Sequence, residues 1–405
     1  MVSFLNTDFY KITMMQAVWQ LFPNVWVKYR YKLRSKDVNL MPYLKRIQNR
    51  VDALQGLGPT QEEIEFLAKQ GFLNPAFLAA LKHFKLNPDE YVKIAEVDGQ
   101  FFLEIEGPWY DTICFEVPLL QIISETYFED RARENPDIFN EGRRRLDAKI
   151  EKLLDYHDKW WRDANSSNVN PFCLMEFGTR RAFSSIWHDE VVAKLALRLP
   201  KDMLLGTSNV HLARTTNLKP QGTMAHEFIC AHGALYPLHE AQKQAFYNWN
   251  KVYQGELGIA LSDTYTFNQF LRDFDKGLAN LFAGARHDSG DPFTWGTKLI
   301  SHYQNLNINP RTKVAVWSDG LNVDLSLRLH QRFAPSIRTT FGIGTDLSND
   351  LGVAPLSQVI KLTQVNGMPV IKISDEPAKV MCEDEQFKNW AMHLFTELIP
   401  SQGIK

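Results

Sequence analysis

The sequence has few cysteines and almost no net charge, and each shortage argues against a class of protein. The cysteines are Cys114, Cys173, Cys230 and Cys382. They are far apart, so the chain contains no CxxC metal knuckle, and the pattern is typical of reduced, mostly buried thiols in a cytosolic protein. The 45 basic and 47 acidic residues nearly balance. This balance argues against a broad nucleic-acid surface but allows a local basic pocket for a phosphorylated small molecule.

Long apolar runs, repeats and low-complexity tracts are also lacking. No apolar run reaches the ~18 residues that a membrane-spanning helix needs. Asp8 and Lys11 interrupt the apolar N-terminal stretch, and no basic segment precedes it, which argues against a signal peptide. We therefore expect a cytoplasmic protein whose partners include neither a membrane nor a nucleic acid.

The 405 residues, of which 44% are hydrophobic and 23% charged, can bury sizeable cores. At roughly 150 residues per domain, this length suggests two or three domains. In the middle of the chain, short apolar runs each lead into Gly, Thr, Ser, Asp or Arg. The runs are 174–177, 203–205, 259–261, 282–285, 314–317 and 339–341. Such a pattern predicts a parallel α/β barrel, whose buried strands carry the chemistry at their C-terminal ends.

The two ends of the chain have a different pattern. Asp98-Gly99 and Asn366-Gly367 each separate two apolar runs, which predicts tight antiparallel hairpins. Helices are predicted at 60–70, 75–84, 117–127 and 138–161, and the polar loop 165–171 is a candidate domain boundary. We expect an irregular, TIM-like α/β barrel over 131–345. Beside it we expect an α+β sandwich domain built from 1–130 and completed by 346–405.

The stretch 222–228, Gly-Thr-Met-Ala-His-Glu-Phe, contains the first candidate for chemistry, His226. The simplest interpretation is a hydrogen-bonded structural histidine. However, Asp263 follows the predicted strand 259–261 and could fix the tautomer of the ring. A histidine held in this way can act as a general base or as a nucleophile towards a phosphoryl group. His232 stands six residues further on, which is not the spacing of a zinc-binding HExxH pair, so we assign no metal ligand.

The densest polar cluster, 286–292, follows the apolar run 282–285. Arg286 offers a planar fork for a carboxylate or a phosphate. Asp288 could bind ribose hydroxyls, or Mg²⁺ through water. The alternative is a capped turn, with Asp291 as N-cap and Pro292 at the first helical position. The two interpretations are compatible, because different side chains serve each.

Two further loops suggest binding of an anion and of an aromatic ring. Gly342 and Gly344 form a glycine-rich loop that lacks the third glycine of a dinucleotide fingerprint, so a phosphate site after a late strand is the better functional interpretation. Asp319, in the turn after 314–317, would lie alongside it. Phe177 and Arg180 pair a ring with a guanidinium group, which suits a flat anionic heteroaromatic. Ordinary tight turns and a helix start with solvated arginines are the alternatives.

Taken together, the motifs resemble one family, the nicotinate phosphoribosyltransferases of the type II phosphoribosyltransferases. They are, in chain order, FGTRR, GTSN, GTMAHE, LSDTYT, RHDSGDP, SDG and FGIGT, and the similarity extends from Thr7 to Asp375. The resemblance implies that nicotinate and 5-phosphoribosyl 1-pyrophosphate form nicotinate mononucleotide and pyrophosphate. It also implies that ATP hydrolysis is coupled through a phosphohistidine and that Mg²⁺ is required.

The resemblance also implies residue roles. His226 would be phosphorylated, with Asp263 orienting it. Phe177 would stack on the pyridine ring, and Tyr10 would stack on the opposite face from the second subunit of a homodimer with shared sites. Arg180 and Arg286 would hold carboxylate and phosphate oxygens, and Asp288 the phosphoribosyl ligand. Further substrate contacts are implied at Thr179, Ser208 and Asp319, 5′-phosphate contacts at Gly320, Gly342, Gly344 and Thr345, and other phosphate contacts at Lys372 and Lys379.

Position 208 bears on the choice of pyridine. The related nicotinamide enzyme has Asp at the matching position, where this chain has Ser208. A carboxylate there would accept a hydrogen bond from an amide and repel a substrate carboxylate, a clash of several kcal/mol in a poorly solvated site. Ser208 therefore favours nicotinate over nicotinamide.

Several alternatives remain open at this point. A nicotinamide or quinolinate enzyme of the same fold is one; Ser208 argues against the first, and the long N-terminal region and the His226 motif against the second. A non-catalytic pyridine-binding relative would bind without turnover. An unrelated sugar-phosphate aldolase would need a Schiff-base lysine at a strand end, and no strand-end motif ends in Lys.

Overall fold

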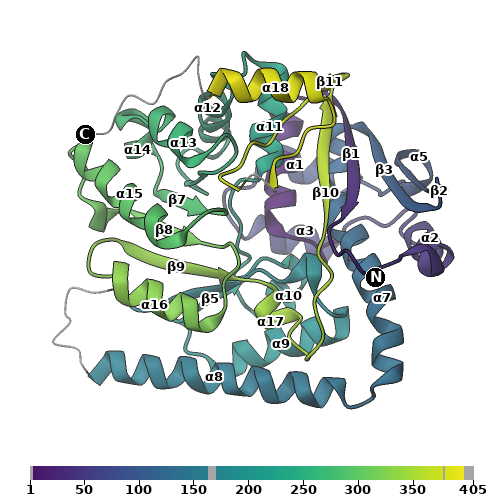
Figure 1. Ribbon diagram of the computed structural model, residues 1–405, viewed down its shortest axis with the longest axis horizontal. Helices are drawn as coiled ribbons and strands as arrows, with labels where there is room; N and C mark the ends of the chain where they lie inside the picture. The colour runs from purple at the N-terminus through teal and green to yellow at the C-terminus, as the bar shows by residue number, and fades with distance from the viewer. Residues whose placement is uncertain (1–2, 163–169, 377–378, 396–405) are drawn as a thin grey trace.

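The computed structural model describes residues 3–162, 170–376 and 379–395, and contains two sheets surrounded by helices (Figure 1). The predicted loop at 165–171 falls largely outside the described residues. No helix of the described part combines the length and the apolar composition needed to cross a bilayer.

One sheet has five antiparallel strands in the order β11-β10-β1-β3-β2 and takes strands from both ends of the chain. The strands are β1 (Trp26–Leu33), β2 (Val92–Val97), β3 (Gln100–Pro108), β10 (Gln358–Val365) and β11 (Met368–Pro369). Both predicted hairpins are present: φ is 50° at Asp98, 72° at Gly99, 49° at Asn366 and 77° at Gly367. Two consecutive residues with positive φ match the twist of the flanking strands. β10 pairs with β1, so the C-terminal segment joins the N-terminal one.

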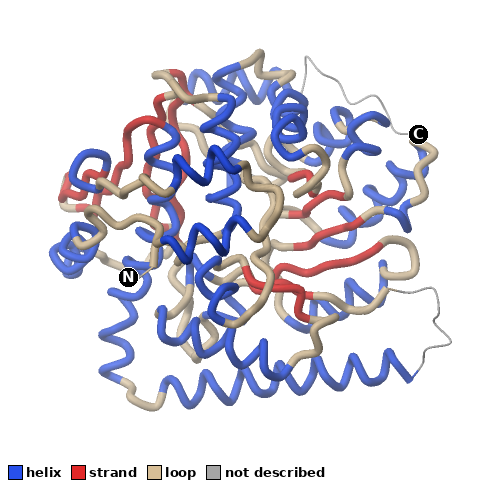
Figure 2. Tube along the Cα trace, turned by 180° about the vertical axis from the view of Figure 1, so that it is seen from behind, coloured by secondary structure: helices blue, strands red, loops and turns tan. Residues whose placement is uncertain are grey.

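The other sheet has six parallel strands in the order β5-β4-β9-β8-β7-β6, shown from behind in Figure 2. The strands are β4 (Leu174–Glu176), β5 (Leu204–Thr207), β6 (Ile259–Leu261), β7 (Gly284–His287), β8 (Val314–Trp317) and β9 (Arg338–Ile343). Each predicted apolar run contains or overlaps one of them. Because the strands are parallel, the polar residues that follow them meet at one edge of the sheet.

The mixed α/β class is therefore correct. β5 and β6 are the two ends of the hydrogen-bonded order, and the described residues contain no ladder between them. A single parallel bridge from Thr207 to Pro220 extends the sheet beyond β5, on the segment that leads to His226. Closure into a barrel and the division into domains stay predictions.

Helices cover both sheets. The α-helices up to the first parallel strands are α1 (Phe9–Leu21), α2 (Leu44–Asp52), α3 (Gln61–Ala68), α4 (Pro75–Leu81), α5 (Pro88–Tyr91), α6 (Trp109–Thr112), α7 (Glu116–Glu134), α8 (Ile138–Arg162) and α9 (Ser185–Arg198). Those that follow are α10 (Val210–Thr215), α11 (His226–Leu235), α12 (Ala241–Tyr253), α13 (Phe267–Asp273), α14 (Lys276–Leu281), α15 (Pro292–Asn305), α16 (Val323–Phe333), α17 (Thr345–Ser348) and α18 (Glu385–His393). Single 3₁₀ turns are η1 (Met41–Tyr43), η2 (Ile113–Phe115), η3 (Thr179–Arg181) and η4 (Pro310–Thr312).

The four predicted helices are present, and local chemistry explains where they begin. Thr60 and Glu63 form a capping box at the start of α3. The predicted helix 117–127 is the buried part of the longer α7. Asp291 caps α15 by accepting a hydrogen bond from the amide of Thr294 at 2.7 Å, so the capped turn is real. The charged helix α8 runs along one side of the parallel sheet (Figure 1), where Leu146 and its neighbours at helical spacing are buried.

Candidate active site

A cavity of about 420 Å³ lies where the C-terminal ends of the parallel strands face β1 and β10. Residues of both sheets and of the N-termini of α1, α7, α11 and α17 line it. Among them are Tyr10, Arg34, Phe177, Arg180, Arg181, Ser208, His226, Arg286, Asp288, Asp319, Gly320, Gly344, Thr345, Lys361, Lys372 and Lys379. The separated motifs of the sequence therefore converge on one space.

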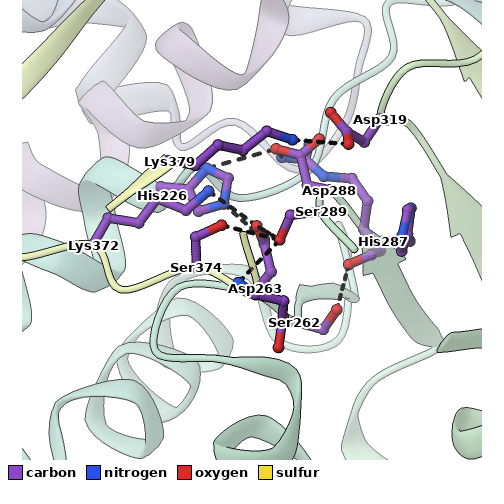
Figure 3. Close-up of polar contacts among 12 residues, drawn as sticks. His226, Ser262, Asp263, His287, Asp288, Ser289, Asp319, Lys372, Ser374 and Lys379 are labelled. Carbon is purple, nitrogen blue, oxygen red and sulfur yellow. Dashed lines mark hydrogen bonds and ion pairs between the residues drawn. The ribbon is translucent and has the colours of Figure 1, made fainter. Parts of the chain in front are cut away.

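His226 is the first residue of α11 and reaches this cavity. Its Nε2 lies 2.7 Å from Oδ1 of Asp263, which follows β6, so the expected pair is present (Figure 3). The other oxygen, Oδ2, accepts hydrogen bonds from Ser289 Oγ at 2.8 Å and from Lys372 Nζ at 2.9 Å. With both oxygens bonded and only 2% of its side chain exposed, Asp263 holds the imidazole in one orientation.

Burial sets the protonation state of His226. Burial lowers the pKa of the ring to about 4; the Lys372 ammonium lowers it further, and Asp263 opposes both effects. His226 is therefore neutral near pH 7. Because Nε2–H donates to the carboxylate, the lone pair is on Nδ1, which lies 3.7 Å from Oδ2 of Asp288. A neutral ring with an accessible lone pair can accept a proton or attack an electrophile.

Arg286 and Asp288 lie beside this ring. Arg286 Nη1 donates to Thr223 Oγ1 at 2.6 Å, and Nη2 lies 3.7 Å from Asp288 Oδ2. Its Nε is buried without a hydrogen-bond partner among the described residues, so the guanidinium retains donor capacity. Burial alone would raise the pKa of Asp288, but Arg286 and then His226 outweigh it and lower that pKa to about 2. Asp288 is therefore ionised, and its Oδ1 accepts from Ser318 Oγ at 2.9 Å.

The cavity offers carboxylate oxygens for a cation. One ligand atom each of His226, Asp263 and Asp288 lies within 4.8 Å of the others. Asp263 uses both oxygens in hydrogen bonds, whereas Asp288 and Asp319 line the cavity. Mg²⁺ prefers one or two carboxylates together with phosphate oxygens and water, so Asp288 and Asp319 fit it best. Lys379 Nζ lies 2.9 Å from Asp319 Oδ2 and would have to share that carboxylate.

Ser208 and Arg180 form the other end of the cavity, together with a carboxylate that sequence reasoning missed. Ser208 Oγ donates to Oδ1 of Asp8 at 2.7 Å, and Arg180 Nε lies 3.6 Å from Asp8 Oδ2. Burial raises the pKa of Asp8, and Arg180 opposes this. Although position 208 is Ser, this end of the cavity therefore still contains a carboxylate, that of Asp8. The signal was present, because Asp8 directly follows Thr7, where the resemblance to the family begins.

Tyr10 lies in the cavity of its own chain. Its hydroxyl is 3.4 Å from Oε2 of Glu116, which also lines the cavity and contacts Arg180 Nη1 at 3.5 Å. Tyr10 thus lines the cavity of the chain that carries it, and its predicted contribution to the site of a second subunit stays a prediction.

Thr179 and Gly342 stand behind the cavity wall rather than on it. Thr179 is fully buried, and its Oγ1 lies 3.3 Å from Ser208 Oγ. A Cβ on Gly342 would lie 2.5 Å from the ring of Phe177, so this glycine makes room for that ring. Gly342 is not among the residues that line the cavity, so its phosphate contact stays a prediction, whereas Gly344 and its neighbour Thr345 do line the cavity.

Three further cationic residues line the cavity and were not singled out. They are Arg34 at the end of β1, Arg181 after β4 and Lys361 in β10. Burial lowers the pKa of Arg181 to about 10, with Arg180 and Arg34 adding to the effect. Burial also lowers the pKa of Lys361 to about 8. Arg181 belongs to the FGTRR motif, but only the strand register reveals that Arg34 and Lys361 point into this space.

Two family models match the chain, the nicotinate phosphoribosyltransferase (NAPRTase) family over residues 172–398 and its N-terminal domain over residues 5–124. This chain belongs to the nicotinate phosphoribosyltransferase family. The protein of that name from Bordetella petrii is 43% identical over 97% of this chain and 98% of its own length. The one from Burkholderia mallei is 44% identical over 97% and 96%.

Solved structures of this family have the same fold. The nicotinate phosphoribosyltransferase of Vibrio cholerae matches with a TM-score of 0.90 and 40% identity over 97% of this chain and 93% of that one. The Porphyromonas gingivalis protein matches with a TM-score of 0.89 and 31% identity over 98% and 99%. The family membership expected from the motifs is therefore confirmed, and the chain is an enzyme of the nicotinate phosphoribosyltransferase type.

Proposed function

We propose that this chain joins nicotinate to 5-phosphoribosyl 1-pyrophosphate and releases nicotinate mononucleotide and pyrophosphate. The supporting observation is that one cavity is lined by an aromatic ring and a guanidinium, Phe177 and Arg180, and by the phosphate-type loop at Gly344, which lies against the backbone of Phe177. His226 lies in the same cavity. A flat anion and a phosphorylated sugar can therefore be held together in one space.

The chemistry needs positioning and charge more than acid–base catalysis. Pyrophosphate leaves the ribose C1 through an oxocarbenium-like state, as in glycosyl transfer. The pyridine nitrogen attacks with its own lone pair, so no general base is required. Arg286, with an unpartnered Nε, and Lys372 can neutralise the departing charge. Phe177 and Tyr10 would orient the pyridine ring, and holding the two substrates in the reacting geometry lowers the barrier.

We propose that Asp288 and Asp319 hold Mg²⁺ together with substrate phosphates. The ion supplies charge neutralisation for the departing pyrophosphate.

For ATP we propose transfer of the γ-phosphoryl group to Nδ1 of His226. The Nδ1 lone pair forms the N–P bond, the bond to the β,γ-bridging oxygen breaks, and ADP leaves with that electron pair. The nucleophile loses no proton, because Nε2–H stays bonded to Asp263. α11 begins at His226 without a side-chain cap, so its first amides can also face the phosphoryl group. Hydrolysis of the N–P bond would restore His226. The added charge would alter affinity for pyrophosphate and Mg²⁺.

Nicotinamide is the second candidate substrate, because the carboxylate of Asp8 beside Ser208 could accept an amide hydrogen bond. Arg180 favours the carboxylate of nicotinate instead, since a guanidinium recognises it by a planar fork. ATP, nicotinate and 5-phosphoribosyl 1-pyrophosphate are thus the proposed ligands. The homodimer with shared sites stays a prediction, and so does the contribution of Tyr10 to the site of a second subunit.

The test is product analysis with each pyridine in turn. The purified chain is given nicotinate, nicotinamide or quinolinate with 5-phosphoribosyl 1-pyrophosphate, Mg²⁺ and ATP. We expect kcat/KM for nicotinate to exceed that for nicotinamide by about 100-fold or more, because only nicotinate carries a negative charge that the Arg180 guanidinium can bind. Equal use of nicotinamide would contradict the assigned specificity. Binding of nicotinate without any mononucleotide would indicate the non-catalytic relative.

A further inference from the structure

A buried acid–histidine pair lies behind the proposed pyridine end of the cavity. Glu176 is the last residue of β4, and His188 is in the first turn of α9. Their side chains are each 1% exposed, and Glu176 Oε1 lies 2.9 Å from His188 Nε2. Neither residue lines the cavity. A buried ion pair seldom stabilises a fold more than apolar residues would. Stability alone therefore does not explain this pair, whereas a role in positioning the neighbouring strand ends does.

The hydrogen bonds of Glu176 join two strand ends. Its Oε1 also accepts from the amide of Gly178 at 2.5 Å, and its Oε2 accepts from Thr207 Oγ1 at 2.6 Å. The amide of Ser208 donates to the backbone carbonyl of Glu176 at 2.8 Å. One residue therefore connects the turn after β4 to the end of β5.

That turn cannot shift freely. A Cβ on Gly178 would lie 2.2 Å from Ser348 Oγ and 2.6 Å from Glu176 Oε1. Ser348 Oγ also donates to the carbonyl of Gly178 at 3.0 Å. The turn carries Phe177 on one side and Arg180 on the other. Its position is thus fixed from behind, away from any ligand.

The charges of the pair support each other. Burial alone would lower the pKa of His188, but Glu176 outweighs it and raises that pKa. Burial alone would raise the pKa of Glu176, but His188 and the hydroxyl of Thr207 outweigh it and lower that pKa. The carboxylate is thus kept ionised, the form that accepts all three side-chain and backbone donors at once.

We propose that Glu176 and His188 are positioning residues for the pyridine substrate. They set the spacing between the wall that carries Phe177 and Arg180 and the wall that carries Ser208. They therefore determine the affinity for nicotinate and not that for 5-phosphoribosyl 1-pyrophosphate. The inference rests on the proposed placement of nicotinate between these walls.

The experiment measures KM for each substrate in Glu176→Gln and His188→Gln. The glutamine at 176 leaves one acceptor oxygen for three donors, so the turn loses its fixed position. We expect KM for nicotinate to rise about tenfold, because small misplacements of a binding group are costly. KM for 5-phosphoribosyl 1-pyrophosphate should stay within about twofold and kcat within about threefold, because the loop after β9 meets Glu176 through backbone pairing at Ile343, which both substitutions keep.

Three further variants control this result. His330→Gln removes another buried histidine, bonded to Tyr156 and to the carbonyl of Asn170, and should leave both KM values unchanged. Thr207→Val removes one donor to Glu176, together with the acceptor of the Asn209 amide, and is the milder variant if the others do not fold. Thr207→Ser keeps the hydroxyl and should restore the nicotinate KM of the wild type.

The variant Phe177→Ala distinguishes failure of the positioning role from failure of the proposed nicotinate site. If Phe177→Ala raises the nicotinate KM while the variants at 176 and 188 do not, the positioning role is overturned. If the KM values for both substrates rise together, the positioning role is also overturned. If Glu176→Gln and His188→Gln do not fold, an unchanged nicotinate KM in Thr207→Val overturns it. If Phe177→Ala itself leaves the nicotinate KM unchanged, the placement of the pyridine fails, and the positioning role with it.

Discussion

The chemistry of single residues in the cavity depends on burial as much as on residue type. His226 is neutral because the protein removes water from its ring, and one of its nitrogens is held by Asp263 at 2.7 Å. Burial alone would raise the pKa of Asp288, and Arg286 makes the largest contribution that lowers it. Residue identity predicted these partners, but their charge states required the structure, because desolvation depends on everything packed around a group.

The depressed pKa of His226 predicts a pH dependence of stability. The ring has a pKa of about 4 in the folded chain against an ordinary 6.5. Below pH 6.5 the unfolded state therefore binds a proton that the folded state does not, and stability falls as pH falls from 6.5 to about 4. His226→Ala should lose less free energy of unfolding over this window than the wild type, in urea titrations at pH 7 and pH 5. An equal loss in both proteins would show that His226 is not buried as a neutral ring.

At the scale of elements, α11 is held in place by a buried ion cluster. Lys11 of α1 is fully buried, and its Nζ lies 2.6 Å from carboxylate oxygens of both Glu116 and Glu227. Oε1 of Glu227 accepts from Tyr29 OH at 2.6 Å and from Trp109 Nε1 at 2.8 Å. The residue after His226 is thus anchored to α1, β1 and α6, which fixes where the helix begins.

Replacing Lys11 should therefore destabilise the chain strongly. Lys11→Met leaves two largely buried carboxylates without their cation, which costs about 3–5 kcal/mol in free energy of unfolding. Denaturant unfolding at pH 7 measures the change. Lys45→Met, at an exposed lysine of α2, is the matched control and should change stability by less than about 0.5 kcal/mol. A similar small change in both variants would refute the anchoring role.

The sequence predicted the helices and strands better than it predicted which of them lie side by side. The strands of the parallel sheet were found because each apolar run ends at Gly, Ser, Thr, Asp or Arg, and α3 and α15 because Thr60 and Asp291 cap them. The order of the strands has no local signal. Lys361 points into the cavity only because β10 pairs with β1 in one register, and a slip of one residue would turn it away.

At the scale of the whole molecule, the cavity is built from both ends and the middle of the chain. Tyr10 and Arg34 come from the N-terminal part, His226 and Arg286 from the middle, and Lys361 from the C-terminal part. The sequence motifs predicted the middle group well, since parallel strand ends must meet. The assignment of Tyr10 to a second subunit rests on the family resemblance alone, since no local pattern tells on which chain this segment packs.

The most direct test of the account is transfer of phosphate to His226. The wild type, His226→Ala and the control His330→Gln are incubated with ATP labelled at the γ-phosphate, without nicotinate. We predict an acid-labile label in the wild type and in His330→Gln and none in His226→Ala. In a second assay that includes nicotinate, His226→Ala should retain transfer from 5-phosphoribosyl 1-pyrophosphate but no longer be stimulated by ATP. Labelling of His226→Ala, or full stimulation by ATP in that variant, would contradict the account.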